Sequence, residues 1–126
     1  MKEITLKFEM RPVPKGRPRF ARGRVFTPKS TSDFERAIRR STKLQLELAG
    51  MEPFAGTLDI GIIFEYKRPK QSTLPVPRAD LDNLIKAVLD GLNEIAFVDD
   101  KQVALISAYK KWSDKDLITV TISELP

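Results

Sequence analysis

One stretch of the chain carries a helix pattern strong enough to constrain the whole fold. Apolar residues recur in it at steps of three and four, as on a helix with one buried face. They are Leu81, Leu84, Ile85, Val88, Leu89, Leu92 and Ile95. We therefore expect a helix over residues 80–95 that packs against the rest of the fold through this face.

Alternation of apolar and polar residues predicts strands elsewhere in the chain. Residues 4–10 and 58–66 alternate clearly, which is typical of half-buried strands. Residues 103–111 and 117–122 also have strand patterns, and only a short polar turn at 113–116 separates them. This spacing predicts an antiparallel hairpin.

A second helix is expected from about Asp33 to Ala49. Ser32 and Glu35 have the spacing of a capping box, and Gly50 suits the position just after a helix end. Leu46 lies off the predicted buried side, which hints at a surface for a partner. The buried side itself is mainly apolar: Phe34, Ile38, Ser41, Leu44, Gln45 and Leu48.

The order of these elements is β-α-β-α-β-β. The chain of 126 residues has room for one hydrophobic core but not for two. We therefore expect a single domain over residues 1–126, of the α/β (α+β) class, with one mixed sheet and two helices packed on it.

The residue types that are missing exclude several kinds of chemistry. The chain has no cysteine and no histidine, so it has no disulfides, no zinc site of the usual kind and no imidazole base. It also lacks a P-loop, so no nucleotide cofactor is expected. No apolar run approaches the length of a membrane span, and a strand pattern follows Met1 without a signal peptide, so we expect a cytoplasmic protein without membrane contact.

The loop at residues 10–32 holds most of the basic character. It has seven positive charges and no acid, against a net charge of +5 for the whole chain. Its four prolines and two glycines rule out a regular element there. A charge run is usually just a solvated arm, but phenylalanines interleaved with arginines favour phosphate contacts with some base stacking. The expected DNA contacts are Lys15, Arg17, Arg19, Arg22 and Arg24 in the loop, with Arg68 and Arg78 near a proline-rich, extended segment before residue 80.

Acidic residues flank the first helix pattern. Asp80 and Asp82 stand at its start, and Asp100 follows its end. Each alone is more often structural than catalytic: an N-cap or first-turn acid such as Asp82 stabilises a helix by about 0.5–2 kcal/mol. Lys86 is four residues from both Asp82 and Asp90, and each such i,i+4 ion pair is worth about 0.2–0.5 kcal/mol when exposed.

Taken together, the acids fit a hard metal ion. Mg²⁺ is usually bound by one or two carboxylates, with waters and substrate phosphate as further ligands. Asp80 and Asp82 can point the same way, and Asp100 can complete the cluster if the helix packs antiparallel to its neighbours. Lys86 can hold a phosphate oxygen or orient the attacking water. Phosphodiester hydrolysis depends mainly on positioning and charge stabilisation, so no histidine is required.

One long motif resembles a known family. It is Asp-Leu-Asp-Asn-Leu-Ile-Lys-Ala-Val-Leu-Asp-Gly-Leu-Asn at 80–93, followed by Asp-Asp-Lys-Gln-Val at 99–103. It closely resembles the RusA-type Holliday-junction resolvases, and the likeness extends over the whole chain in length and element order. The resemblance implies a homodimeric, Mg²⁺-dependent endodeoxyribonuclease, for which Mn²⁺ can substitute, that cuts four-way junctions symmetrically in DNA recombination and repair. It assigns metal binding and catalysis to Asp80, Asp82 and Asp100, and an essential basic role to Lys86.

Two other functions remain open at this stage. The first is a nuclease with the same metal chemistry that prefers forks or flaps. The second is a basic DNA-binding module without catalysis, in which the aspartates only cap helices and anchor turns.

Overall fold

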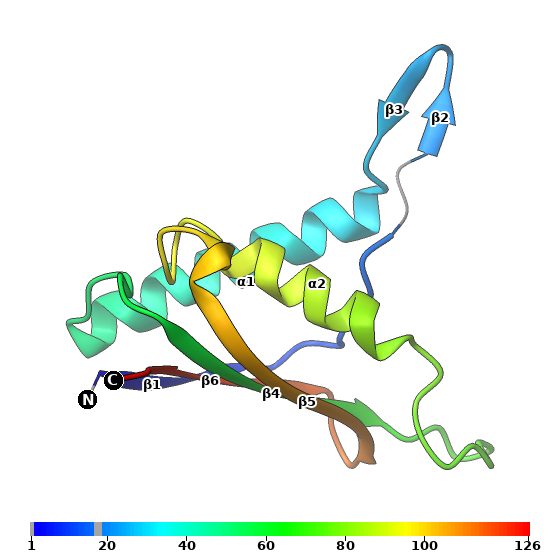
Figure 1. The fold of residues 1–126 in the computed structure, drawn as a ribbon. Coiled ribbons are helices and arrows are strands. Elements are labelled where there is room, and N and C mark those ends of the chain that lie inside the picture. The colour runs from blue at the N-terminus through cyan, green and yellow to red at the C-terminus, as the bar shows by residue number, and fades with distance from the viewer. Residues whose placement is uncertain (1, 17–18) are drawn as a thin grey trace.

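The structure is a computed structural model that describes residues 2–16 and 19–126. A four-stranded sheet carries two helices on one face, and a two-stranded hairpin projects away from them (Figure 1). The elements are β1 (Glu3–Phe8), β2 (Arg19–Ala21), β3 (Arg24–Phe26), α1 (Lys29–Ala49), β4 (Leu58–Lys67), α2 (Leu81–Leu92), a 3₁₀ turn η1 (Asp100–Gln102), β5 (Val103–Ser113) and β6 (Leu117–Glu124). The predicted α+β class is confirmed. Within the described residues, no helix is both long and apolar enough to cross a membrane.

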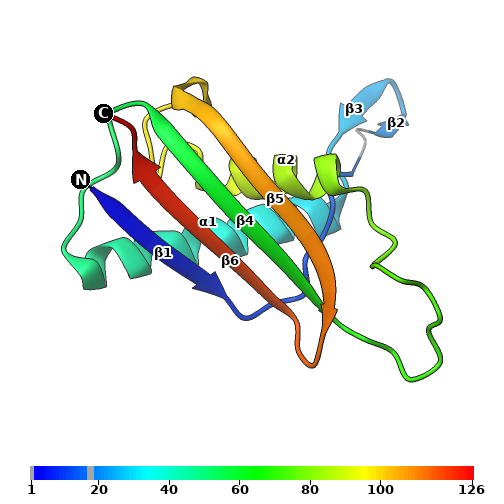
Figure 2. The same ribbon diagram turned by 60° about the horizontal axis from the view of Figure 1, so that its bottom comes forward.

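The strand order of the sheet is β1-β6-β4-β5 (Figure 2). β4 pairs antiparallel with β6 and parallel with β5, so the sheet is mixed, as expected. The predicted hairpin of β5 with β6 is wrong, because β4 lies between them. The turn that joins β5 to β6 crosses the end of β4 and binds it: the Lys67 amide donates to Asp116 Oδ1 at 2.8 Å, and the Arg68 amide donates to the Ser113 carbonyl at 3.1 Å.

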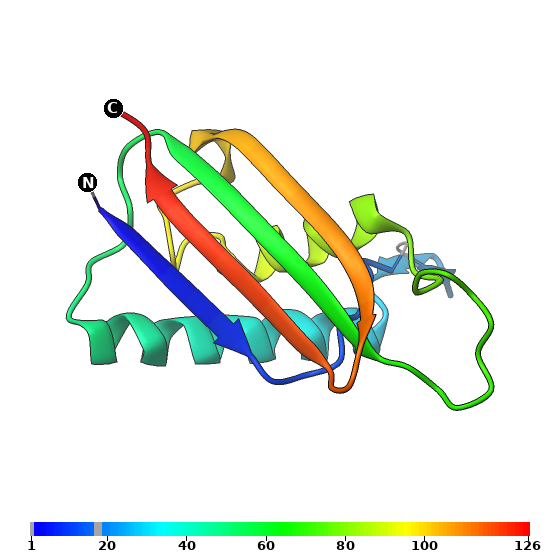
Figure 3. The ribbon, with the colours of Figure 1, turned by 90° about the horizontal axis from the view of Figure 1, so that it is seen from below.

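The core lies between the helices and one face of the sheet. Alternate residues of β4 from Leu58 to Tyr66 are buried beneath the helices. Both helices of the described residues lie on this one face, and the opposite face of the sheet is open in Figure 3. α2 faces the core with Leu84, Val88 and Leu92, as the apolar spacing predicts.

Helix α1 begins earlier than expected, at Lys29. Pro28 is its N-cap residue, and its carbonyl accepts hydrogen bonds from the amides of Thr31 and Ser32 at 3.1 Å each. The predicted capping box is therefore wrong, and Glu35 bonds to Lys15 instead. The predicted end is confirmed: Gly50 has a left-handed φ of 65° and donates its amide to the Glu47 carbonyl.

The buried residues of α1 also differ from the predicted ones. Leu46 is only 4% exposed, whereas Leu44 and Leu48 are 56% and 79% exposed. The predicted buried stripe was therefore out of phase in the second half of the helix, and Leu46 is not part of a partner surface. The buried residues are Thr31, Phe34, Ile38, Thr42 and Leu46.

The basic loop contains a regular element, against expectation. β2 and β3 form an antiparallel hairpin in which Phe20 pairs with Val25. Arg22 and Gly23 form its tip, with φ angles of 52° and 74°. Two consecutive positive φ angles are typical of tight hairpin turns, and glycine adopts them without steric cost. Gly23 therefore favours the hairpin turn, whereas the glycines of this loop were expected to rule out a regular element.

Candidate active site

The chain before α2 is held in one position against β5. The indole Nε1 of Trp112 and the guanidinium of Arg68 both donate to the carbonyl of Leu74, at 2.8 and 3.1 Å. Lys110 Nζ donates to the carbonyl of Ala79 at 2.6 Å. The backbone that precedes the first aspartate is therefore anchored at two points.

Asp80 and Asp82 stand together at the start of α2 with exposed side chains. Asp80 is the N-cap residue in extended conformation, but its carboxylate makes no capping hydrogen bond. Asp82 lies in the first turn, and its Oδ1 accepts the amide of Asn83 at 3.0 Å. The helix start therefore uses little of the hydrogen-bonding capacity of these two carboxylates.

Asp100 lies at the other end of α2. Its amide donates to Asn93 Oδ1 at 3.1 Å, just after the helix, while Ala79 lies beside Lys110 near the end of β5. α2 thus runs antiparallel to β5, and its 12 residues rise about 1.5 Å each, which separates the two ends by about 18 Å.

Antiparallel packing therefore keeps Asp100 away from Asp80 and Asp82 within one chain, contrary to the geometric argument made from the sequence. In the part of the chain that the structure describes, no group of three acids is placed to hold a metal ion. Asp80 and Asp82 alone still fit Mg²⁺, which often uses one or two protein carboxylates and fills its other positions with water and phosphate.

The neighbour of Asp100 has a structural role. The carboxylate of Asp99 accepts the amide of Lys101 at 2.9 Å, and Gln102 Oε1 accepts the amide of Asp99, which together form a capping box for η1. The hydrogen bond from Lys101 lowers the pKa of Asp99.

Lys86 lies one turn after Asp82 on α2. Its ammonium is 3.5 Å from Asp90 Oδ1, and its side chain is 62% exposed. A loosely paired, exposed ammonium can move to a phosphate oxygen at small cost. The basic role of Lys86 that the motif implies stays a prediction.

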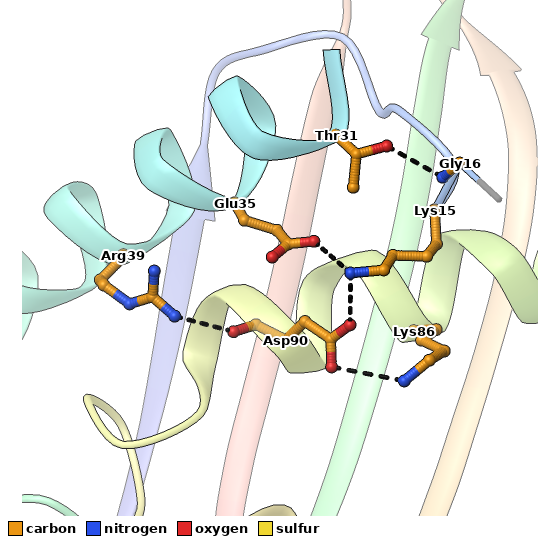
Figure 4. A network of polar contacts seen from close by, with 7 residues as sticks. All are labelled: Lys15, Gly16, Thr31, Glu35, Arg39, Lys86 and Asp90. Atoms are coloured by element: carbon orange, nitrogen blue, oxygen red, sulfur yellow. Dashed lines mark hydrogen bonds and ion pairs between the residues drawn. The ribbon is translucent and has the colours of Figure 1, made fainter. Parts of the chain in front are cut away.

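Lys15 joins the basic loop to both helices (Figure 4). Its ammonium is 2.7 Å from Glu35 on α1 and 3.0 Å from Asp90 on α2. Its own amide donates to the carbonyl of Asn83 at 2.9 Å. Burial lowers the pKa of Lys15, but the hydrogen bonds to the two carboxylates outweigh it and raise the pKa overall. Lys15 is therefore an anchor for the loop, and its expected role as a DNA contact is not supported.

The side chains of the remaining expected DNA contacts differ in their exposure and in the contacts they already make. Arg22 and Arg24 are exposed on the hairpin, next to Phe20, which is 74% exposed. Arg17 lies outside the described residues, as does the side chain of Arg19. Arg68 lies over the ring of Trp112, with its guanidinium carbon 5.9 Å from the ring centre, whereas Arg78 is exposed beside Asp80.

A cavity that the sequence did not reveal opens beside Asp80. Arg11, Tyr66, Arg78 and Trp112 are among its lining residues, and its volume is about 380 Å³. These residues are far apart in the chain and belong to two loops and two strands, so no local pattern could have grouped them.

Comparison with known proteins identifies the class to which this fold and site belong. The family described as Endodeoxyribonuclease RusA matches residues 9–123. The chain therefore belongs to the RusA family of endodeoxyribonucleases, and the resemblance seen in the sequence is confirmed.

A curated relative matches a shorter part of the chain. It is the "Uncharacterized protein YqaN" of Bacillus subtilis (strain 168), which is 34% identical over 59 residues. The match covers 47% of this chain and 42% of that protein. This chain thus spans less than half the length of that relative.

Proposed function

We propose that the protein is a Mg²⁺-dependent endodeoxyribonuclease that resolves four-way DNA junctions by paired, symmetric nicks during recombination and repair. The observation that supports it most is the pair Asp80 and Asp82, exposed and scarcely used by the helix, with Lys86 one turn further on. Membership of the RusA family supports the same activity. A nuclease of this kind works where the DNA is, so the proposal includes a cytoplasmic location.

Asp80 and Asp82 would hold the metal ion. When bound, Mg²⁺ lowers the pKa of a coordinated water and neutralises charge on the phosphate; Mn²⁺ can take its place. Lys86 contacts a phosphate oxygen of the scissile linkage, and Asp90 keeps the ammonium near it. Anchoring of residues 74–79 to β5 holds the carboxylates in place while the DNA is bound.

The arrangement in one chain suggests how a homodimer would complete the site. β5 is an edge strand, and its Leu105 and Tyr109 are 49% and 50% exposed. If two β5 edges pair antiparallel about a two-fold axis, the start of each strand lies beside the end of the other. Asp100 of the partner subunit would then approach Asp80 and Asp82. We propose this dimer because it brings all three expected ligands together and gives two sites for two strands.

The hairpin β2–β3 supplies the main DNA-binding arm in this proposal. Its exposed arginines and phenylalanine combine phosphate contact with a surface for base stacking. Arg78, beside Asp80, would hold the strand that is cut. A non-catalytic binding module is disfavoured, because exposed carboxylates beside a basic surface repel phosphate unless a cation lies between them.

The test is incubation with a synthetic four-way junction, a replication fork, a flap and a linear duplex of the same sequence, each with and without Mg²⁺. The proposal predicts symmetric nicks in opposite strands of the junction, only with metal. Faster cutting of the fork or flap would favour the alternative substrate. Binding to all four without cutting, with either Mg²⁺ or Mn²⁺, would reject the nuclease.

A further inference from the structure

The cavity beside Asp80 has walls that are fixed by hydrogen bonds. Tyr66 Oη donates to the carbonyl of Pro12 at 2.9 Å, and Trp112 Nε1 donates to the carbonyl of Leu74 at 2.8 Å. The two rings meet edge to face, with their centres 6.4 Å apart. The cavity is therefore preformed, and its volume of about 380 Å³ lies within the range of about 300–1,000 Å³ that is common for small-ligand pockets.

The lining suits a planar group attached to an anion. None of the lining residues is acidic, while Arg11 and Arg78 both contribute to it. The guanidinium carbon of Arg11 lies 5.0 Å from the centre of the Tyr66 ring. Its only ion pair among the described residues is a loose one with Asp116 Oδ1 at 3.8 Å, and the Arg11 side chain is 60% exposed, so it can turn to an anion. Arginine planes and aromatic rings both stack on nucleobases, and arginine also binds phosphate.

The position of the cavity connects it to the carboxylates. Arg78 and Ala79 line it, and Asp80 is the next residue. A phosphate held at Asp80 would therefore have a neighbouring nucleotide close to the cavity mouth.

We propose that this cavity receives one unstacked base of the nucleotide next to the scissile phosphate. The inference rests on the proposed nuclease function and adds a specificity site to it. A base at a branch point costs less to unstack than a base inside a duplex. The cavity thus offers a physical reason for cutting at branch points in preference to duplex DNA, and for a preference among bases at the cut.

The experiment compares junctions that differ by a single missing base. The wild-type protein first defines the cut sites. Junctions are then made with one abasic residue at each of the positions that flank the scissile phosphate, and single-turnover cleavage is measured. Loss of the stacked base should slow cleavage by about tenfold at one position and leave the other positions nearly unchanged.

A cavity-filling variant connects that effect to the cavity itself. Ser72 lines the cavity, and its hydroxyl accepts the amide of Leu74 at a long 3.4 Å, while its own amide donates to the carbonyl of Pro69 at 3.1 Å. Ser72→Leu should slow cleavage of the intact junction about as much as removal of the base does, and the abasic residue should cause no further loss. Thr73→Leu is the matched control, since it adds the same side chain at the next residue, which is exposed and does not line the cavity, and it should cleave normally.

The outcomes separate this inference from the proposed function. Normal cleavage of every abasic junction, or an equal abasic effect in Ser72→Leu and wild type, would overturn the base pocket while the nuclease stands. Failure of the wild type to cut any intact junction would instead reject the proposed function. The abasic series uses only wild-type protein, so it decides the matter even if Ser72→Leu does not fold.

Discussion

At the scale of single residues, the ammonium of Lys15 connects the basic loop to both helices. It is only 23% exposed and lies between the carboxylates of Glu35 and Asp90. Without Lys15, these two carboxylates would repel each other, and the remaining ammonium near them, that of Lys86, is more exposed and 3.5 Å from Asp90. Lys15 therefore stabilises the packing of the basic loop against α1 and α2. It also positions Lys86 indirectly, because both lysines pair with Asp90.

We expect Lys15→Met to lower the free energy of unfolding by about 1–2 kcal/mol, since it removes two charge-assisted hydrogen bonds that solvent partly screens. Lys29→Met is the control, because Lys29 pairs with Asp33 at a site where the lysine side chain is 88% exposed. The control should change stability by less than about 0.5 kcal/mol. Urea unfolding of both variants measures the difference.

The pH dependence of this effect has a definite sign. The folded-state pKa of Lys15 is raised above its ordinary value of 10.5. The stabilisation is therefore complete below pH 10.5 and is lost as pH rises through the folded-state pKa. The gap in melting temperature between wild type and Lys15→Met should be constant from about pH 7 to 9 and should narrow above pH 10.5. A gap that widens at high pH would contradict this role.

At the scale of elements, Gly91 allows α1 and α2 to pack closely. A Cβ atom at this position would lie 2.7 Å from both Cβ and Cγ2 of Ile38. The glycine of the motif thus has a packing role that its sequence context did not reveal.

Gly91→Ala should destabilise the protein, because overpacking costs about 1–3 kcal/mol and the gain in helix propensity returns only about 1 kcal/mol. Gly56→Ala, whose new Cβ would come no closer than 3.4 Å to a neighbour, serves as the control and should be nearly neutral. Thermal melts measure both. If Gly91→Ala also melts like wild type, the two helices pack less tightly than the structure shows.

The hairpin β2–β3 should act as a phosphate-binding element. Replacing Arg22 and Arg24 by alanine should weaken junction binding and reduce the slope of log K against log salt by about 0.9 for each lost phosphate contact. Lys7→Ala with Lys115→Ala removes the same charge from other elements and should leave the slope nearly unchanged. Equal slopes for the two double variants would show that only net charge matters.

Sequence patterns predicted most helices and strands correctly, but they predicted less well which strands pair with each other. The apolar spacing of α2 and the alternation of β4 report burial directly, so both were predicted correctly. The position of β4 between β5 and β6 is set by its pairing with both strands, and such long-range pairing leaves no periodic signal in the sequence. The start of α1 was missed because Glu35 bonds to Lys15, a partner distant in sequence, and not to the helix start.

The candidate site follows the same rule. Asp80, Asp82 and Lys86 could be proposed together because they share one short segment at the start of one helix. Their distance from Asp100 depends on the direction in which α2 crosses the sheet, and the cavity depends on residues from Arg11 to Trp112. Neither of these can be deduced from spacing along the chain.

At the scale of the whole molecule, the separation of Asp100 from Asp80 makes the dimer testable. Asp82→Asn and Asp100→Asn should each abolish cleavage when alone. If sites form across the dimer, a mixed dimer has one intact site, made from Asp80 and Asp82 of one subunit and Asp100 of the other.

Mixing the two inactive variants, with time for subunit exchange, should therefore restore nicking of one strand but not paired cuts. If each chain builds its own site, every mixed dimer has one lesion in each site and the mixture stays inactive. Sedimentation at micromolar concentration provides the supporting measurement, and a strict monomer that still makes paired cuts would contradict the dimer.

The most direct test of the central claim is the Asp82→Asn variant, compared with Asp114→Asn, which removes the same charge from an exposed turn. Asparagine can still accept the Asn83 amide, so folding should be unchanged in a thermal melt. We predict that Asp82→Asn binds a four-way junction at least as tightly as wild type without metal, but loses Mg²⁺-dependent cleavage, while Asp114→Asn cuts normally. Near-normal cleavage by a folded Asp82→Asn variant would contradict the account, because Asp82 would then be a first-turn acid of α2 and not a ligand for the catalytic metal.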